Sequence, residues 1–275
     1  MDMFAAAALL GLGSPRGRRR FDPLAALLGL RLAQRVADAD LARRAPATLA
    51  LLVLNVAFFI TPIADSLFGA PGTYTSVALC PSRLVAGEHP LSWLLVPSFM
   101  HANDGGWHIY YNMGALLTDG VLLERAVGTK RFVATTAAIT LLKSLLYIAV
   151  SYAVTAAGLS NTYNTCVHGF SGVLFGFSAL LHGPLGDRVF VQRTRRIPLL
   201  DTDVEIEYII WVELLLASVL CYNVSFVGHL SGILAGLAVG YVLVAARGYP
   251  VDQLRRVAAR GCPLGGRTWI SRSSG

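Results

Sequence analysis

Three short segments, far apart in the sequence, carry the side-chain types that acyl transfer requires. His108 and Asn112 are four residues apart, so they share one face of a predicted helix. Ser171 opens a second apolar segment and is a candidate nucleophile, which needs a base within hydrogen-bond reach. His229 opens a third segment and is the candidate base. Near a helix start and partly desolvated, its imidazole is expected to be neutral at pH 7, as a general base must be.

Glycines explain how the two helices of this pair could approach each other. Gly172 and Gly176 follow the candidate nucleophile on one helix face. The helix of His229 carries small residues at intervals of three and four, which form one stripe: Gly232, Gly236 and Gly240. Stripes of small residues let transmembrane backbones pack closely, so these glycines are predicted to bring the hydroxyl to the imidazole.

Acyl transfer also needs hydrogen-bond donors for the developing oxyanion. The side chains of Asn112 and His108, together with the backbone N–H of Ser171, are the predicted donors. Phe175, one turn after the nucleophile, is predicted to stack on the ring of the base. Asp104 is the one carboxylate near these segments, and it falls in a loop. The sequence therefore predicts a Ser–His dyad without a third, acidic member.

The composition indicates a membrane protein. Of the 275 residues, 55% are hydrophobic and 14% are charged, whereas soluble domains are about one quarter charged. Four cysteines are too few for a disulfide-stapled scaffold. The predicted fold is all-α, a bundle of six transmembrane helices whose fourth is short and central, with spans at about 48–68, 108–123, 132–154, 169–182, 208–224 and 227–245.

The basic residues predict the orientation of this bundle. Of 23 Lys and Arg, eight precede the first span, three lie between spans two and three, four between spans four and five, and six follow the last. The positive-inside rule then places both termini in the cytosol. The three chemical segments consequently begin at the same, non-cytosolic depth. The net charge of +7 needs no nucleic-acid partner and favours contact with anionic lipid.

Three domains are expected. Residues 1–47 form a basic cytosolic segment with a surface helix at about 23–45, residues 48–245 form the membrane domain, and residues 246–275 form a basic, disordered tail. No cofactor is expected. No metal is expected either, because the loop histidines His101 and His168 have no metal-ligand spacing with cysteine or carboxylate.

Two features stay open at this level. Lys143 falls inside the third span, where an ionised lysine is costly, and no role is assigned to it. Cys80 and Cys166 are both predicted on the non-cytosolic side, where a disulfide could form. The spacing alone does not decide whether they pair.

The motifs together resemble the rhomboid family of intramembrane serine proteases. The resemblance rests on His108-x-x-x-Asn112, on Gly169-x-Ser171-Gly172-x-x-x-Gly176 and on His229-x-x-Gly232-x-x-x-Gly236, and it covers about residues 48–245. Further stretches, including Leu123-Glu124-Arg125 and Trp211-Val212-Glu213-Leu214, are similar to the rhomboid-related-protein-four branch. That resemblance implies Ser171 as nucleophile, His229 as base, membrane-protein substrates, and quality control in the endoplasmic reticulum membrane.

Three other classes of function compete with the protease. An inactive rhomboid relative would bind and retain or dislocate membrane clients, but such relatives lack the Ser or the His that are present here. A transporter would show paired broken helices and internal symmetry, and neither is found in the sequence. A membrane scaffold gives no reason for three polar helix starts to share a depth. Substrate identity and oligomeric state do not follow from the sequence.

Overall fold

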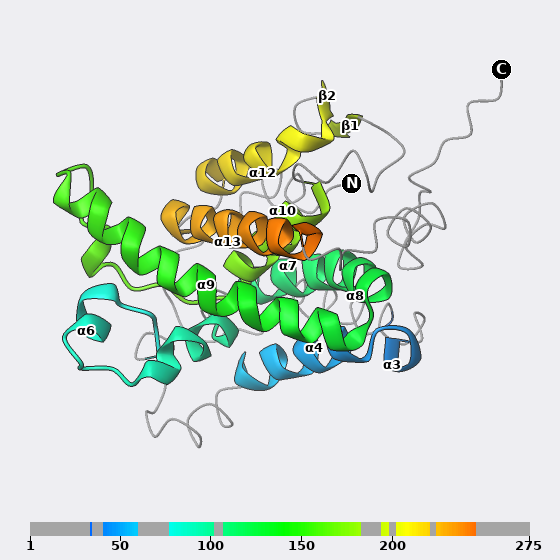
Figure 1. The fold of residues 1–275 in the computed structure, drawn as a ribbon, viewed down its shortest axis with the longest axis horizontal. Helices are drawn as coiled ribbons and strands as arrows, with labels where there is room; N and C mark the ends of the chain where they lie inside the picture. The colour runs from blue at the N-terminus through cyan, green and yellow to red at the C-terminus, as the bar shows by residue number, and fades with distance from the viewer. Residues whose placement is uncertain are drawn as a thin grey trace.

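The chain folds into a bundle of helices with one small β-hairpin. The structure, a computed structural model, describes residue 34 and residues 41–59, 77–101, 107–182, 194–197, 202–220 and 224–245. The elements of the membrane domain that matter most for the site are α4 (Pro46–Phe59), α7 (Trp107–Ala115), α8 (Val121–Val127), α9 (Thr129–Ala156), α10 (Ser171–His182), α12 (Ile206–Leu220) and α13 (Phe226–Ala245). Figure 1 shows α10 behind α13 at the centre, with α9 and α4 below them and α12 above.

Each of the six predicted spans overlaps a helical segment. The second span is one continuous rod, because a π-helical turn, η3 (Leu116–Gly120), joins α7 to α8. By length and composition, two of the described helices could cross a membrane, Thr129–Ala156 and Phe226–Leu243. The helices α4 and α10 are shorter and apolar, and α10, with 12 residues, lies within the short fourth span predicted at 169–182.

The helix α9 buries several polar residues along its middle and exposes large apolar residues on the opposite face. Its buried face includes Thr136, Thr140 and Ser144, whose hydroxyls donate to the backbone carbonyls of the residues four positions earlier at 2.8, 2.8 and 3.1 Å. Val133 and Leu145 on the opposite face are 52% and 46% exposed. A helix in water has the reverse arrangement, so this pattern fits a bundle whose outer face meets lipid.

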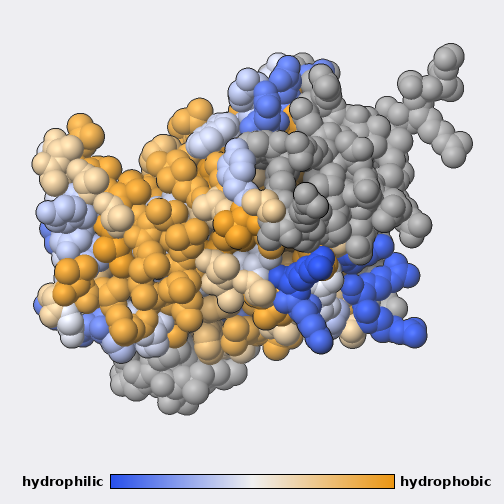
Figure 2. Space-filling model, viewed as in Figure 1, coloured by the Kyte–Doolittle hydropathy of each residue, from blue (hydrophilic) through white to orange (hydrophobic). Residues whose placement is uncertain are grey.

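A hydrophobic surface extends over the helices on the face seen in Figure 2, with hydrophilic residues gathered at the edges. Exposed large apolar side chains lie on α4, α9, α12 and α13, among them Val53, Leu141, Leu215, Val219 and Val242. Contiguous apolar surface of this kind is rare on soluble monomers. It is the surface that a membrane-embedded domain presents to hydrocarbon.

A buried carboxylate holds the start of the bundle together. Glu124 of α8 is 1% exposed and accepts hydrogen bonds from the backbone N–H groups of Ala47 and Thr48 at 3.0 and 2.7 Å. The hydroxyls of Thr48 and Thr129 donate to the same carboxylate, both at 2.8 Å. An acidic group is favourable at a helix N-terminus, so Glu124 caps α4 and ties it to α8 and α9.

The closest helix contact joins α10 to α13 through glycines. A Cβ built on Gly232 would lie 2.8 Å from the carbonyl carbon of Gly172, and one built on Gly236 would lie 2.8 Å from the Cα of Gly176. Real side chains do not tolerate such distances, so the two backbones touch only because these positions lack a Cβ. Gly232 and Gly236 of the predicted stripe therefore lie in the interface between α10 and α13, as the spacing predicted.

The all-α prediction missed one element. Residues of β1 (Thr194–Ile197) and β2 (Thr202–Glu205) form a two-stranded antiparallel sheet, with Thr194 opposite Glu205 and Ile197 opposite Thr202. The segment was expected to be a basic loop, but β-branched residues at both of its ends favour strand pairing. The predicted surface helix at 23–45 lies mostly outside the described residues, of which Gln34 and α3 (Leu41–Arg44) are helical. The tail at 246–275 lies wholly outside them.

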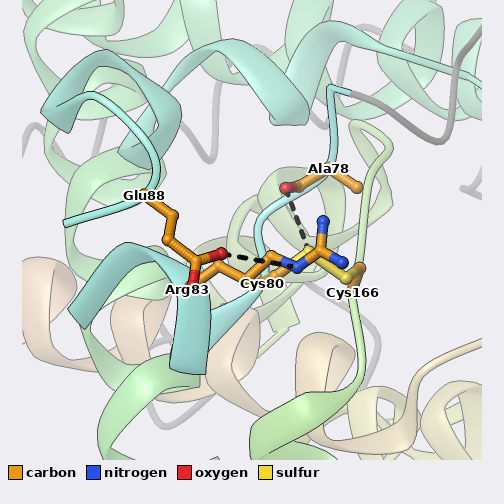
Figure 3. Close-up of polar contacts among 5 residues, drawn as sticks. All are labelled: Ala78, Cys80, Arg83, Glu88 and Cys166. Atoms are coloured by element: carbon orange, nitrogen blue, oxygen red, sulfur yellow. Dashed lines mark hydrogen bonds and ion pairs between the residues drawn. A yellow bond between two sulfur atoms is a disulfide. The ribbon is translucent and has the colours of Figure 1, made fainter. Parts of the chain in front are cut away.

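Two loops at one end of the bundle are joined covalently. Cys80, just before α6 (Pro81–Val85), forms a disulfide with Cys166, and Figure 3 shows the bond beside the Arg83–Glu88 ion pair. The neighbouring residues Leu79 and Val167 exchange two backbone hydrogen bonds of 2.8 and 3.0 Å. The spacing of Cys80 and Cys166 left their pairing open, and in the structure they are paired. The disulfide anchors the loop that leads into α10.

Replacing Gly232 with Ala should separate α10 from α13, because the new methyl group would meet the backbone of Gly172. Overpacking of this kind costs about 1–3 kcal/mol, which corresponds to a melting temperature lower by about 5 °C in detergent. Ala238→Val on the exposed side of the same helix is the matched control and should leave the melting temperature near that of the wild type. Equal melting temperatures for Gly232→Ala and the wild type would contradict the close contact.

Removing the disulfide should lower the free energy of unfolding by about 2–4 kcal/mol, since it closes a long loop of the unfolded chain. Thermal unfolding of the wild type with and without dithiothreitol measures this effect. The Cys80→Ser, Cys166→Ser double variant should melt at the temperature of the reduced wild type and should not respond to the reductant. A wild-type melting temperature that is insensitive to reduction would count against a stabilising disulfide.

Candidate active site

A glycine turn sets the start of α10. Gly169 has a φ of +114°, a conformation that residues with a side chain rarely adopt. Its N–H donates to the carbonyl of Pro97 at 2.9 Å, which fastens this turn to the 3₁₀ helix η2 (Val96–Phe99). Phe170 then accepts the first helical hydrogen bonds, from the N–H groups of Val173 and Leu174. Ser171 is consequently held at the first residue of α10, where backbone N–H groups have no partner within the helix.

His229 lies in the first turn of α13, which a serine caps. The Ser225 side chain accepts a hydrogen bond from the N–H of Gly228 at 3.0 Å, and its carbonyl accepts one from the N–H of His229 at 3.0 Å. Serine at this position satisfies an N–H group that the helix itself cannot. Ser225 was not singled out from the sequence, although a serine directly before an apolar helical segment is a capping signal.

The hydroxyl of Ser171 and the imidazole of His229 are in contact. Their Oγ and Nε2 atoms are 2.9 Å apart, although the residues are separated by 58 positions in the sequence. The ring of Phe175 lies on that of His229, with centroids 4.4 Å apart and planes inclined by 31°. The histidine is 6% exposed, and its Nδ1 has no hydrogen-bond partner within the part of the chain that the structure describes. This arrangement allows a proton to pass from the hydroxyl to the ring.

His108 of α7 lies near the start of α10, beside Gly169. Its Cε1 and Nε2 atoms would be 3.0 and 3.1 Å from a Cβ at Gly169, and the Ser171 Oγ would be 3.8 Å from the same point. Because Gly169 lacks a Cβ, the ring of His108 has room next to the turn that leads into Ser171. A side chain at Gly169 would fill the space that this ring occupies.

Asn112 lies one turn further along α7 and is 4% exposed. One hydrogen of its amide goes to the carbonyl of His108 at 2.7 Å, and its Oδ1 is buried without a partner among the described residues. An asparagine amide carries two donor hydrogens, so this bond leaves one for a ligand. Among the hydrogen bonds described for these residues, none joins Asn112 to Ser171 or to His229.

Two further histidines stand next to His108. Its ring centroid is 5.2 Å from that of His101, which is fully buried, and 6.4 Å from that of His168. Burial, together with the neighbouring His108 and His168, holds the pKa of His101 well below its usual value, so His101 is neutral at pH 7. Both were expected to be ordinary loop histidines near the site, and the structure packs the ring of His101 against that of His108. Within the described ranges, no group of three His, Cys, Asp or Glu side chains could hold a metal ion.

A second polar contact, not foreseen from the sequence, joins α10 to α12. The hydroxyl of Ser178 donates to the Glu213 carboxylate at 2.9 Å and lies 3.4 Å from the Nδ1 of His182. The surrounding contacts between the two helices are apolar and involve Phe175, Ala179, Ile210, Leu214 and Ala217. Sequence reasoning missed this contact because its partners are 35 residues apart and lie on segments with ordinary apolar patterns.

Comparison with known proteins agrees with this geometry. Residues 89–246 match the family described as "Rhomboid domain". The human and mouse proteins named "Rhomboid-related protein 4" are both 34% identical to the chain, over 197 and 199 residues, with 70% of this chain and 56% of each relative aligned. "Rhomboid-like protein 14, mitochondrial" of Arabidopsis thaliana is 30% identical over 201 residues, covering 70% of this chain and 54% of the relative.

The chain spans about half the length of the curated relatives it matches. The family match nevertheless covers more than half of the chain itself and includes Ser171, His229, His108 and Asn112. The resemblance predicted from the motifs is thereby confirmed. The chain belongs to the rhomboid family, whose members are polytopic membrane proteins and in general intramembrane serine proteases.

Proposed function

We propose that this protein is an intramembrane serine endopeptidase that hydrolyses peptide bonds in or near the transmembrane segments of membrane-protein substrates. The observation that carries the proposal is the 2.9 Å contact between Ser171 Oγ and His229 Nε2 at the meeting point of two helices. Ser171 is the nucleophile and His229 is the general base. An unactivated serine is a weak nucleophile, and a histidine at hydrogen-bond distance supplies the activation.

The reaction proceeds by acyl transfer. The Ser171 Oγ attacks the scissile carbonyl carbon while its proton passes to His229 Nε2, and the carbonyl π bond opens to an oxyanion. As the C–N bond breaks, the imidazolium returns that proton to the departing amine. A water molecule, deprotonated by His229, then hydrolyses the acyl-enzyme and releases Ser171. No carboxylate is needed in this scheme, in keeping with a dyad.

The oxyanion is stabilised by donors on two helices. The backbone N–H of Ser171 lies at the start of α10, and His108 reaches the same region from α7, beside Gly169. Asn112 offers the amide hydrogen that is not bonded to the His108 carbonyl. Phe175 keeps the His229 ring in its orientation by packing on it. Donors fixed before the reaction stabilise the transition state without reorganising.

The substrate is a transmembrane segment with helix-breaking residues near its non-cytosolic end. A regular helix satisfies its own backbone groups and shields its carbonyls, so Gly, Pro or polar residues make local unwinding cheaper. The substrate enters by displacement of α12, which packs on α10 through apolar contacts and the Ser178–Glu213 hydrogen bond. The glycine contact between α10 and α13 leaves no comparable room.

The site faces an oxidising compartment, and we assign the protein to the endoplasmic reticulum membrane with six spans and both termini in the cytosol. Support comes from the Cys80–Cys166 disulfide, which joins the loops next to the start of α10. Disulfides persist in the lumen of the secretory pathway and are rare in the cytosol. The positive-inside rule, which places most of the Lys and Arg residues on the opposite, cytosolic side, agrees with this orientation.

Replacing Ser171 with Ala should abolish both reporter cleavage and labelling by a fluorophosphonate probe, because the attacking oxygen is removed. Replacing His229 with Ala should reduce both by more than about 10³-fold, since the hydroxyl then lacks its base. The measurements are gel-based labelling of the detergent-solubilised protein and cleavage of a single-pass membrane reporter in liposomes.

Ser231→Ala is the matched control for the nucleophile variant. Ser231 is a buried serine of α13 whose hydroxyl bonds to the Val227 carbonyl of its own helix at 2.7 Å. This variant should retain labelling and cleavage. Labelling that survives Ser171→Ala would reject the nucleophile, and a wild type that binds the reporter without cleaving it would favour the inactive, client-retaining class of rhomboid relative.

Replacing Asn112 with Ala should lower kcat for reporter cleavage by about 10²–10³-fold with little change in KM, because the donor acts on the transition state. Asn55→Ala is the matched control: Asn55 is a buried asparagine whose amide makes the same type of bond, to the Leu51 carbonyl at 2.7 Å, within α4. Equal losses in the two variants would indicate that Asn112 serves the helix and not the oxyanion.

A further inference from the structure

Lys143 occupies a position in the bundle that the reaction scheme does not explain. It lies in the middle of α9 on the buried face and is 8% exposed. The polar residues that flank it, Thr140 and Ser144, bond to carbonyls of their own helix. A buried lysine within a membrane span is costly, so its retention usually reflects a function.

The stem of Lys143 lies against the backbone that carries the Ser–His pair. A Cβ built on Gly172 would be 3.0 Å from Lys143 Cδ, 3.7 Å from its Cε and 3.3 Å from the carbonyl oxygen of Gly228. Gly172 directly follows Ser171, and Gly228 directly precedes His229. Lys143 therefore lies where α9, α10 and α13 meet, behind both members of the pair.

The charged and titratable groups around His229 lie at different distances from its ring. Lys143 lies against Gly172 where the carbonyl of Gly228 also approaches, and His108 lies beside Gly169 at the start of α10. Three buried or partly buried titratable groups lie on the helices that pack on α13: Tyr147 of α9, which clusters with Val227; His182 of α10, beside Ser178; and Glu213 of α12, bonded to Ser178. The same helices also carry Lys130, Arg131 and Tyr152 on α9 and Glu207 and Tyr208 on α12. Ser178 is seven residues beyond Ser171, so the one described carboxylate on these helices near α10 lies about two turns from the pair.

We propose that the ammonium group of Lys143 is a positioning charge for the dyad: it disfavours the imidazolium form of His229 and so keeps Nε2 available to accept the proton of Ser171. The inference rests on the proposed protease function and deepens it. Repulsion between like charges favours the neutral form of the histidine.

The same charge should have little effect on the chemical step itself. In the tetrahedral intermediate the imidazolium and the oxyanion are present together, so a neighbouring cation acts on a pair with no net charge. Its repulsion of one member is offset by attraction to the other. The effect of Lys143 should consequently appear in the pH dependence of the free enzyme and not in the rate at alkaline pH.

The test is the pH profile of Lys143→Met, an uncharged side chain of similar length. We expect the acid limb of the fluorophosphonate labelling rate, and of kcat/KM for the reporter, to move to higher pH by about one unit. At a pH below both midpoints the variant should label up to about tenfold more slowly than the wild type. On the alkaline plateau the two should agree within about twofold. Lys143→Arg, which keeps the charge, should restore the wild-type midpoint.

Lys130→Met is the matched control, since Lys130 is an exposed lysine near the cytosolic start of the same helix and its loss should leave the midpoint unchanged. Lys143→Gln provides a second uncharged variant should the methionine variant fail to fold. Two results with a folded, uncharged variant would overturn the role of Lys143 while leaving the protease intact. One is an acid-limb midpoint equal to that of the wild type. The other is a loss of rate that is the same at every pH. Absence of Ser171-dependent labelling in the wild type would overturn the proposed function and this role with it.

Discussion

The contact of two backbones without intervening side chains is the constraint on which the site depends. Gly172 and Gly176 of α10 meet Gly232 and Gly236 of α13 at distances that no Cβ would permit. A serine and a histidine on helices at ordinary separation would be too far apart for a direct hydrogen bond, since packed helix axes are commonly 8–10 Å apart. Here their polar atoms are 2.9 Å apart. The glycines thus allow the short distance between the two helices, and larger residues at these positions would not.

The remaining helices must hold this pair in an environment without the usual hydrophobic driving force between helices. The bundle does so with buried polar groups that are satisfied locally. Thr136, Thr140 and Ser144 bond to their own helix, and Glu124 gathers the N–H groups at the start of α4. Each bond removes a polar group that would be costly in hydrocarbon. The outer surface is then free to be apolar, as Figure 2 shows.

The two sides of the dyad differ in rigidity and in charge. On the side of the loops, the Cys80–Cys166 disulfide and the hydrogen bond from Gly169 to Pro97 fix the turn that leads into α10. On the side of α12, apolar contacts and one hydrogen bond between Ser178 and Glu213 close the bundle. Behind the pair lies Lys143. In the proposed protease, a substrate that displaces α12 would reach Ser171 in a position that the glycine contact and the disulfide-linked loops already fix.

The sequence by itself determined the helical segments, the inward stripe of glycines and the types of residue at the three helix starts, because apolar runs and spacings of three or four residues are local properties of the chain. Only the tertiary structure decided that Cys80 pairs with Cys166, that His101 packs on His108, and that Glu124 caps a helix 76 residues away. It also placed Lys143 against Gly172. The sequence alone showed only that a lysine falls within an apolar span. The hairpin of β1 and β2 escaped prediction for the same reason. Contacts between distant segments depend on how whole helices pack, and no periodicity within one segment records which neighbour its buried face will meet.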